Sequence, residues 1–215
     1  MAREQPGLRE RKKQATRVAL REAALRLAFE HGPENVRVED IAAAADVSPR
    51  TYNNYFSSRE HAIVAAVAAE REAQIAAAVA ARPAGDRLAD VVTAAIVAQY
   101  TDPGERARDT LLLITTHPPL RGAFLETTAA LEQPLADAIA GRLRDADSLT
   151  ARVLAAAAAA AVRVALEQWL QPPAASMAAT GLMVPSGSLP GLLHAALAPL
   201  GPAFDAAEQT TTGPG

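Results

Sequence analysis

The chain has 215 residues, of which 50% are hydrophobic and only 4% aromatic, and its formal net charge is -3. Alanine dominates the apolar residues, which favours helices over strands and predicts an all-α protein. Cysteine is absent, which excludes a disulfide framework and a thiolate metal site, and the length favours a small lobe attached to a larger one.

Positive charge is concentrated at the N-terminal end of the chain. Residues 1–26 carry eight Lys or Arg against three Glu, so the acidic surplus lies downstream. Such an excess is typical of a surface that binds nucleic acid, and equally of a solvated helix face. No apolar signal segment opens the chain, and the longest apolar run, Val153 to Val162, is shorter than the roughly twenty residues of a membrane span. We therefore expect a cytoplasmic protein.

The first sixty residues predict three helices in close succession. A long helix covers 8–31 and is ended by Gly32-Pro33, and a short one covers 38–45. The third opens with Ser48 as N-cap and Pro49 at the first helical position, and it closes near Phe56. Two short helices separated by a tight turn indicate a helix-turn-helix.

Polar residues of the third helix have the chemistry of a base-reading surface. Arg50, Asn53 and Asn54 share one face, and their side chains match guanine (Arg) and adenine (Asn) in a major groove. Thr51 and Tyr55 flank that face and are placed to donate hydroxyls to phosphates. The alternative is that Asn53 and Asn54 form a simple polar surface pair. The aromatic residues Tyr52 and Phe56, four apart, are expected to pack inward.

A long helix follows from 58 to 82. Ser57, with Glu60 three residues later, forms a capping box at its start. The helical pattern expected along this helix consists of Ile63, Val67, Glu70, Gln74 and Ala78.

Residues 38–42 and 46–60 resemble the signature of the tetracycline-repressor (TetR) family of bacterial regulators. The shared features are a Val-Ser start, Thr51 in the recognition helix, a Tyr-Phe pair and Ser-Arg-Glu opening the next helix. The resemblance covers about residues 10–65, roughly a quarter of the chain. It implies a homodimer that binds a palindromic duplex operator and responds to a small molecule. It also implies that Arg50, Thr51, Asn53, Asn54 and Tyr55 contact DNA and that Arg59 meets a phosphate.

Three positions depart from the family pattern. Asp46 stands where a glycine is common, in a turn that needs a left-handed backbone, which Asp tolerates better than most residues. Arg37 replaces a Thr or Ser that caps the second helix, and its role stays open between a lost cap and a phosphate contact. Asn53 replaces a frequent aromatic residue.

The remainder predicts helices but little chemistry. Helices are expected at 86–101, 111–116, 119–144 (kinked at Pro134), 148–170 and 189–200, with a loop at 171–188. One apolar row consists of Leu120, Phe124, Leu131, Leu135, Ile139 and Leu143. Residues expected to line a ligand pocket are Gln99, Tyr100, Thr115, His117, Phe124 and Trp169. The alternative for each is a local hydrogen bond or a solvent-facing position.

The expected architecture is a DNA-binding domain at 1–57, of which 1–7 is flexible, a regulatory and dimerisation domain at 58–200, and a disordered tail at 201–215. The helices 148–170 and 189–200 are expected to form the dimer interface, with Ala158 and Ala159 inside it. The four histidines lie in separate elements and no nucleophile or phosphate-loop motif is present, so we expect neither an enzyme nor a metal or cofactor. The expected function is a ligand-released repressor. The alternatives are a ligand-independent regulator or activator and, in a different class, a non-enzymatic helical adaptor.

Overall fold

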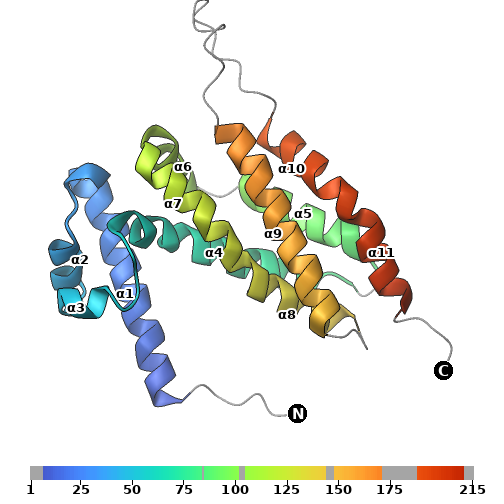
Figure 1. The fold of residues 1–215 in the computed structure, drawn as a ribbon, viewed down its shortest axis with the longest axis horizontal. Helices are drawn as coiled ribbons and strands as arrows, with labels where there is room; N and C mark the ends of the chain where they lie inside the picture. Colours follow the sequence, from blue (N-terminus) through green and yellow to red (C-terminus); the bar gives the residue numbers. More distant parts are fainter. Residues whose placement is uncertain (1–6, 84, 102–104, 144–147, 171–187, 211–215) are drawn as a thin grey trace, which may run out of the picture.

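The structure, a computed structural model, describes residues 7–83, 85–101, 105–143, 148–170 and 188–210, and every regular element in these ranges is helical (Figure 1). The prediction of an all-α protein is confirmed for this part of the chain. The N-terminal unit consists of α1 (Leu8–His31), a 3₁₀ turn (Pro33–Asn35), α2 (Val38–Ala44) and α3 (Pro49–Tyr52). The larger lobe consists of α4 (Arg59–Ala81), α5 (Leu88–Thr101), α6 (Glu105–Thr116), α7 (Pro118–Thr127), the 3₁₀ turn η2 (Thr128–Leu131), α8 (Glu132–Arg142), α9 (Ser148–Leu170), α10 (Leu189–Leu197), η4 (Ala198–Leu200) and α11 (Gly201–Thr210).

Helix α4 connects the two parts of the molecule. It packs against α1 on the side of the N-terminal unit and against α5, α7 and α8 on the side of the larger lobe, and Figure 1 shows it crossing the middle of the fold. Its buried residues recur at four-residue steps: Ile63, Val67, Arg71, Ile75 and Val79. Of the residues in the expected pattern, Ile63 and Val67 are buried, whereas Glu70 and Gln74 are exposed and hydrogen-bond to each other at 3.3 Å. Packing on both sides of α4 thus selects a row that contains an arginine.

The single helix expected at 119–144 is broken into α7 and α8. Pro134 lies in the first turn of α8, and its ring cannot be accommodated against the carbonyl of residue 130 in a continuous helix. The chain therefore tightens into η2 just before it, where the Thr127 and Thr128 hydroxyls donate to the Phe124 and Leu125 carbonyls, each at 2.7 Å. The predicted apolar row survives the break, and all six of its residues are buried.

The prediction of a disordered tail from residue 201 is wrong for residues 201–210, which form α11. Phe204 and Ala207 are buried, and α11 packs against α5. Arg87 donates to both carboxylate oxygens of Asp205, at 2.8 and 2.6 Å, and the Leu88 amide donates to Glu208 at 3.0 Å. These long-range contacts stabilise a helix that is too short to be stable on its own and that the local sequence does not predict. Residues 211–215 and the expected loop at 171–187 lie outside the described residues.

Helix α9 is the one described helix that is long and apolar enough to cross a membrane. The segment Leu149–Leu170 has a mean hydropathy of 1.7. The apolar part of this helix is therefore longer than the uninterrupted run from Val153 to Val162. One face of α9, including Ala155, Ala158 and Val162, is buried, and the helix packs against α8 and α10. A core helix of a helical bundle has this composition too.

Candidate DNA-binding surface

The turn between α2 and α3 has the backbone geometry that its sequence suggests. Asp46 has φ 54°, and it is the one residue other than glycine with a positive φ in the described part of the chain. The next amide, of Val47, donates back to the Ala42 carbonyl at 2.9 Å, which closes the end of α2. Asp therefore occupies the left-handed position that was expected of it.

Helix α3 is fixed at its start by Ser48. The Ser48 hydroxyl oxygen accepts the Thr51 amide at 3.1 Å and lies 2.9 Å from the Thr51 hydroxyl, as expected of an N-cap. Tyr52 and Phe56 are buried, with ring centroids 5.8 Å apart, and the Tyr52 hydroxyl donates to the Ser58 carbonyl at 2.7 Å. Burial, with a smaller effect from nearby Glu60, raises the pKa of Tyr52, so its hydroxyl stays protonated. These aromatic residues decide which side of α3 faces inward.

The residues expected to read bases lie on the opposite side. Arg50, Asn53 and Asn54 are exposed, while Thr51 and Tyr55 are half-buried at the edge of this surface. The predicted helix to Phe56 was too long, because α3 ends at Tyr52. Asn53 nevertheless keeps helical backbone angles, and the Asn54 amide donates to the Thr51 carbonyl at 3.1 Å. The turn therefore continues the direction of the helix and carries both asparagines outward.

Arg59 lies at the start of α4, and its half-buried side chain bonds to other groups of the protein. Its Nη1 donates to the Glu34 and Val36 carbonyls at 3.0 and 2.8 Å, and its Nε donates to Glu60 at 2.8 Å. The N-cap of α4 is Ser58, which accepts the His61 amide at 3.2 Å, so the predicted capping box at Ser57 was one residue early. Arg59 thus joins α4 to the segment after α1.

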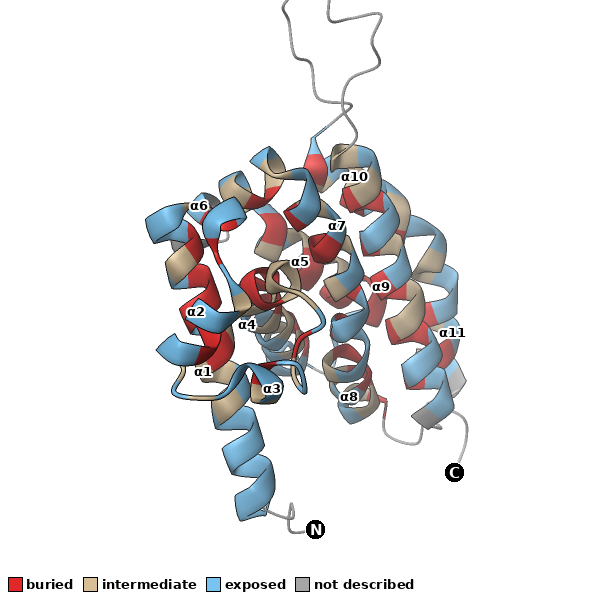
Figure 2. Ribbon diagram, turned by 60° about the vertical axis from the view of Figure 1, so that its left-hand side comes forward, coloured by how far each residue is buried: buried red, intermediate tan, exposed pale blue. Residues whose placement is uncertain are grey.

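The second departure from the family pattern, Arg37, is the N-cap position of α2 and makes no side-chain capping bond. It is exposed, as are the basic residues of the first turns of α1. Figure 2 shows this end of α1 extending beyond the rest of the molecule, on the side where α3 lies. The exposed basic residues at this end are Arg9, Arg11, Lys12, Lys13 and Arg17. Arg17 lies 5.5 Å above the Phe56 ring, which brings α1 close to the end of the helix-turn-helix.

Comparison with known proteins agrees with this geometry. Residues 20–67 match the family model "Bacterial regulatory proteins, tetR family", and residues 86–205 match the model "MftR C-terminal domain". The chain is 32% identical over 175 residues to the HTH-type transcriptional regulator TcmR of Streptomyces glaucescens, covering 76% of this chain and 77% of that protein. The chain belongs to the TetR family. It is a DNA-binding transcription regulator. Among solved structures it resembles the Thermus thermophilus TetR-family repressor FadR in complex with lauroyl-CoA, with 21% identity, a TM-score of 0.46, and coverage of 86% of this chain and 92% of that chain.

The residues predicted to bind a ligand in this TetR-family regulator do not form one site. Tyr100 and Phe124 are both buried and line one small cavity in the larger lobe. Gln99, Thr115, His117 and Trp169 are half-buried and do not line that cavity. Thr115 donates to the Leu112 carbonyl at 3.0 Å, and the His117 ring nitrogen Nδ1 lies 2.8 Å from the Leu113 carbonyl oxygen.

The cavity contains a residue that sequence reasoning missed, Arg71. It stands at the third position of the buried row Ile63, Val67, Arg71, Ile75 and Val79. The available signal was an arginine at four-residue spacing inside an otherwise apolar row.

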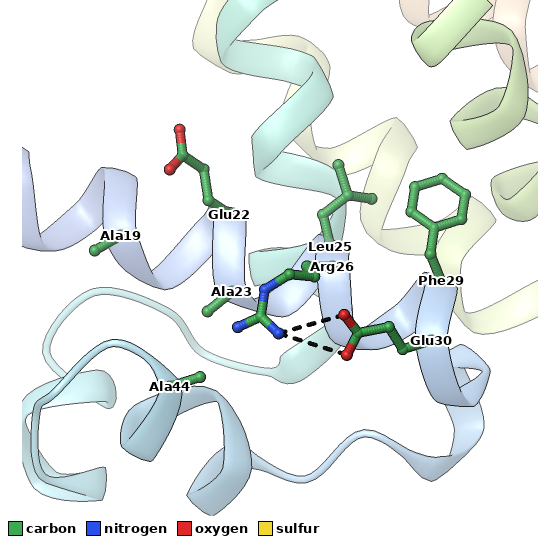
Figure 3. A pocket seen from close by; sticks show the side chains of 8 residues that line it. All are labelled: Ala19, Glu22, Ala23, Leu25, Arg26, Phe29, Glu30 and Ala44. Carbon is green, nitrogen blue, oxygen red and sulfur yellow. Dashed lines mark hydrogen bonds and ion pairs between the residues drawn. The ribbon is translucent and has the colours of Figure 1, made fainter.

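A surface hollow of the regulator lies elsewhere, between α1 and α2. Figure 3 shows the Arg26–Glu30 ion pair, 3.4 Å long, on the α1 side of this hollow, and Ala44 on the α2 side. Its volume is about 680 Å³, but it is open to solvent and is lined by none of the residues predicted to bind DNA or ligand. The hollow therefore adds no residue to the predicted DNA-binding surface or to the predicted ligand pocket.

Proposed function

We propose that this TetR-family regulator is a cytoplasmic repressor that binds a palindromic duplex operator as a homodimer and is released by a small molecule. The observation that carries the DNA-binding part is the exposed surface of Arg50, Asn53 and Asn54, backed by the buried pair Tyr52 and Phe56. Rigid support on one side and bidentate donors on the other are what major-groove readout requires. The DNA-binding unit is residues 1–57, and the regulatory unit begins at residue 58.

The dimer is proposed to form through α9 and α10. An exposed apolar stripe runs along α9, and its large members are Leu149, Val153 and Val164, each at least half exposed. A stripe of this kind on a soluble helix is typical of a protein interface. Ala158 and Ala159, expected inside the interface, are instead buried within their own protomer. The interface proposed here is therefore the opposite face of α9.

Release is proposed to act through α4. A ligand in the larger lobe changes the position of α4, and α4 packs directly on α1 of the N-terminal unit. Two recognition helices must lie about 34 Å apart, or a multiple of it, to enter successive major grooves. A small change in that spacing in the ligand-bound population lowers operator affinity.

The test is a titration with a duplex recovered by selection from genomic fragments. Asn54→Ala and Arg50→Ala should each weaken binding by about 1 to 3 kcal/mol and relax the sequence preference, because each removes a bidentate donor. Arg82→Ala, which removes an exposed arginine from the far end of α4, is the matched control and should bind like the unmodified protein. Equal affinity of all three variants at fixed salt would show that α3 does not read the DNA.

A further inference from the structure

Arg71 is buried in the larger lobe with one nitrogen of its guanidinium group left without a hydrogen-bond partner in the described part of the chain. It is 6% exposed, and its guanidinium carbon lies 4.4 Å from the Tyr100 ring centroid and 5.2 Å from that of Phe124. Its Nη2 has no hydrogen-bond partner among the residues that the structure describes. Tyr100 makes a side-chain hydrogen bond with Arg71, but a buried donor left without an acceptor costs stability, so stability alone does not explain an arginine at this position.

The neighbouring acid does not fill this role. Glu72 is adjacent in sequence on α4 and lines the same cavity as Arg71. Burial raises the pKa of Glu72, against the attraction of Arg17, Arg71 and Arg21, so its surroundings disfavour its charged form. The ion pairs described for arginines involve Arg26, Arg59, Arg87 and Arg163.

The unpartnered nitrogen belongs to a residue that lines a cavity of about 20 Å³. The walls come from α4, α5, α7 and η2 and are mostly apolar, including Ile75, Leu131 and the two aromatic rings. Thr127 and Thr128 also line it, but their hydroxyls already donate to backbone carbonyls. Arg71 is thus the strong donor left for a guest, and the cavity has room for about one water in the present conformation.

We propose that the effector is an organic anion with an apolar body, whose carboxylate pairs with Arg71 while the body packs against Tyr100 and Phe124. This rests on the proposed function, which assigns a small-molecule effector to the larger lobe. An arginine fork pairs with a carboxylate through charge-assisted hydrogen bonds, and such bonds are strongest where water is excluded. The apolar part of the walls binds the rest of the ligand by burial, and Glu72, the acid in the lining, has its charged form disfavoured by its own burial.

The size of the cavity links binding to the DNA-binding unit. A ligand larger than a water must displace part of the cavity wall, to which α7 contributes Phe124 and η2 contributes Leu131, and we assign the movement to this side of the cavity. Helix α7 touches the N-terminal half of the chain at both ends. The His117 ring lies 3.6 Å from the Glu34 carboxylate, and Glu126 lies 2.6 Å from the His61 ring. Movement of α7 on ligand binding is therefore transmitted to the segment that follows α1 and to the first turn of α4.

The experiment measures thermal unfolding of the full chain with two matched pairs of probes: sodium octanoate with octanamide, and sodium benzoate with benzamide. At least one acid should raise Tm more than its amide. Arg71→Met should remove that difference, weakening the apparent affinity for the acid by about tenfold or more. Arg71→Met should also raise Tm without any probe, because it no longer buries a charged group whose Nη2 lacks an acceptor among the described residues. Arg71→Lys, which keeps the charge, should retain part of the preference for the acid.

Two results would overturn this inference: acid and amide acting alike on the unmodified protein, or an acid preference that persists in Arg71→Met. A fall in Tm of unliganded Arg71→Met would overturn it as well, because it would mean that Arg71 is structural. Duplex binding by each protein separates the two proposals. A protein that binds its operator but shows no acid preference refutes the anionic effector alone, whereas failure to bind duplex DNA refutes the proposed function.

Discussion

Arg59 shows how one side chain holds the DNA-binding unit on the larger lobe. Its two bonds to the Glu34 and Val36 carbonyls cross from the first turn of α4 to the segment that leads into α2. Hydrogen bonds from a charged donor to backbone carbonyls contribute more than neutral ones. The side chain is therefore a positioning residue, although the family resemblance alone assigns it to a phosphate.

Arg59→Ala should lower the free energy of unfolding by about 1 to 3 kcal/mol and weaken binding to all duplex sequences alike. Urea unfolding combined with a duplex titration measures both effects. Arg59→Lys keeps the charge but not the geometry of the fork, and it should restore little stability. If Arg59 were only a phosphate contact, unfolding would be unchanged and the salt dependence of binding would fall by about one charge.

At the scale of the element, α11 depends on contacts with the start of α5. Phe204 is buried, the Arg87–Asp205 pair is formed by two hydrogen bonds, and Glu208 accepts the first amide of α5. A ten-residue helix is marginal alone, so these contacts decide that residues 201–210 are ordered.

The Arg87–Asp205 pair predicts a pH dependence. The hydrogen bonds and charge of Arg87 lower the pKa of Asp205 below its ordinary 3.8. Because the folded value lies below the unfolded one, the stabilisation is present above 3.8 and is lost as pH falls through the folded value. Asp205→Asn should therefore have a lower Tm than the unmodified protein at about pH 7, and the difference should disappear in acid.

Asp90→Asn is the matched control, because Asp90 lies 3.5 Å from the same arginine and is 71% exposed. Its effect on Tm should be smaller at every pH. A Tm difference for Asp205→Asn that stays constant down to the most acidic pH would contradict the assignment of the pair.

At the scale of the whole molecule, the proposed dimer face and the core face of α9 are distinct. Val153 is 57% exposed, whereas Ala158 is fully buried within the protomer. Val153→Arg should lower dimerisation and operator binding together while leaving helicity and the unfolding of the monomer intact. Sedimentation equilibrium with circular dichroism measures these quantities.

Two further variants complete that comparison. Leu112→Arg places the same charge on an exposed apolar position of α6 and should leave the dimer unchanged. Ala158→Arg should instead unfold the larger lobe, at a cost of several kcal/mol for a buried charge. A stable dimer of Val153→Arg with full operator affinity would show that the protomers meet elsewhere.

The sequence by itself determined the features that depend on neighbouring residues. The Ser48-Pro49 start, the left-handed Asp46 and the inward Tyr52-Phe56 pair follow from local backbone preferences and from four-residue spacing, and the outward surface of Arg50, Asn53 and Asn54 follows from them. These few positions, together with the alanine-rich composition, are sufficient to predict an all-α protein with an N-terminal helix-turn-helix.

Only the tertiary structure decided the features that depend on distant residues. The phase of α4, which buries Arg71 instead of Glu70, is chosen by α5, α7 and α8 packing around it. Residues 201–210 are helical because they contact α5, more than a hundred residues earlier in the chain. Arg59 has its role because it bonds to backbone carbonyls that the sequence does not mark as acceptors. In each case the local sequence allows more than one conformation or contact of similar free energy. Only the free energy of packing the whole molecule decides which of them forms.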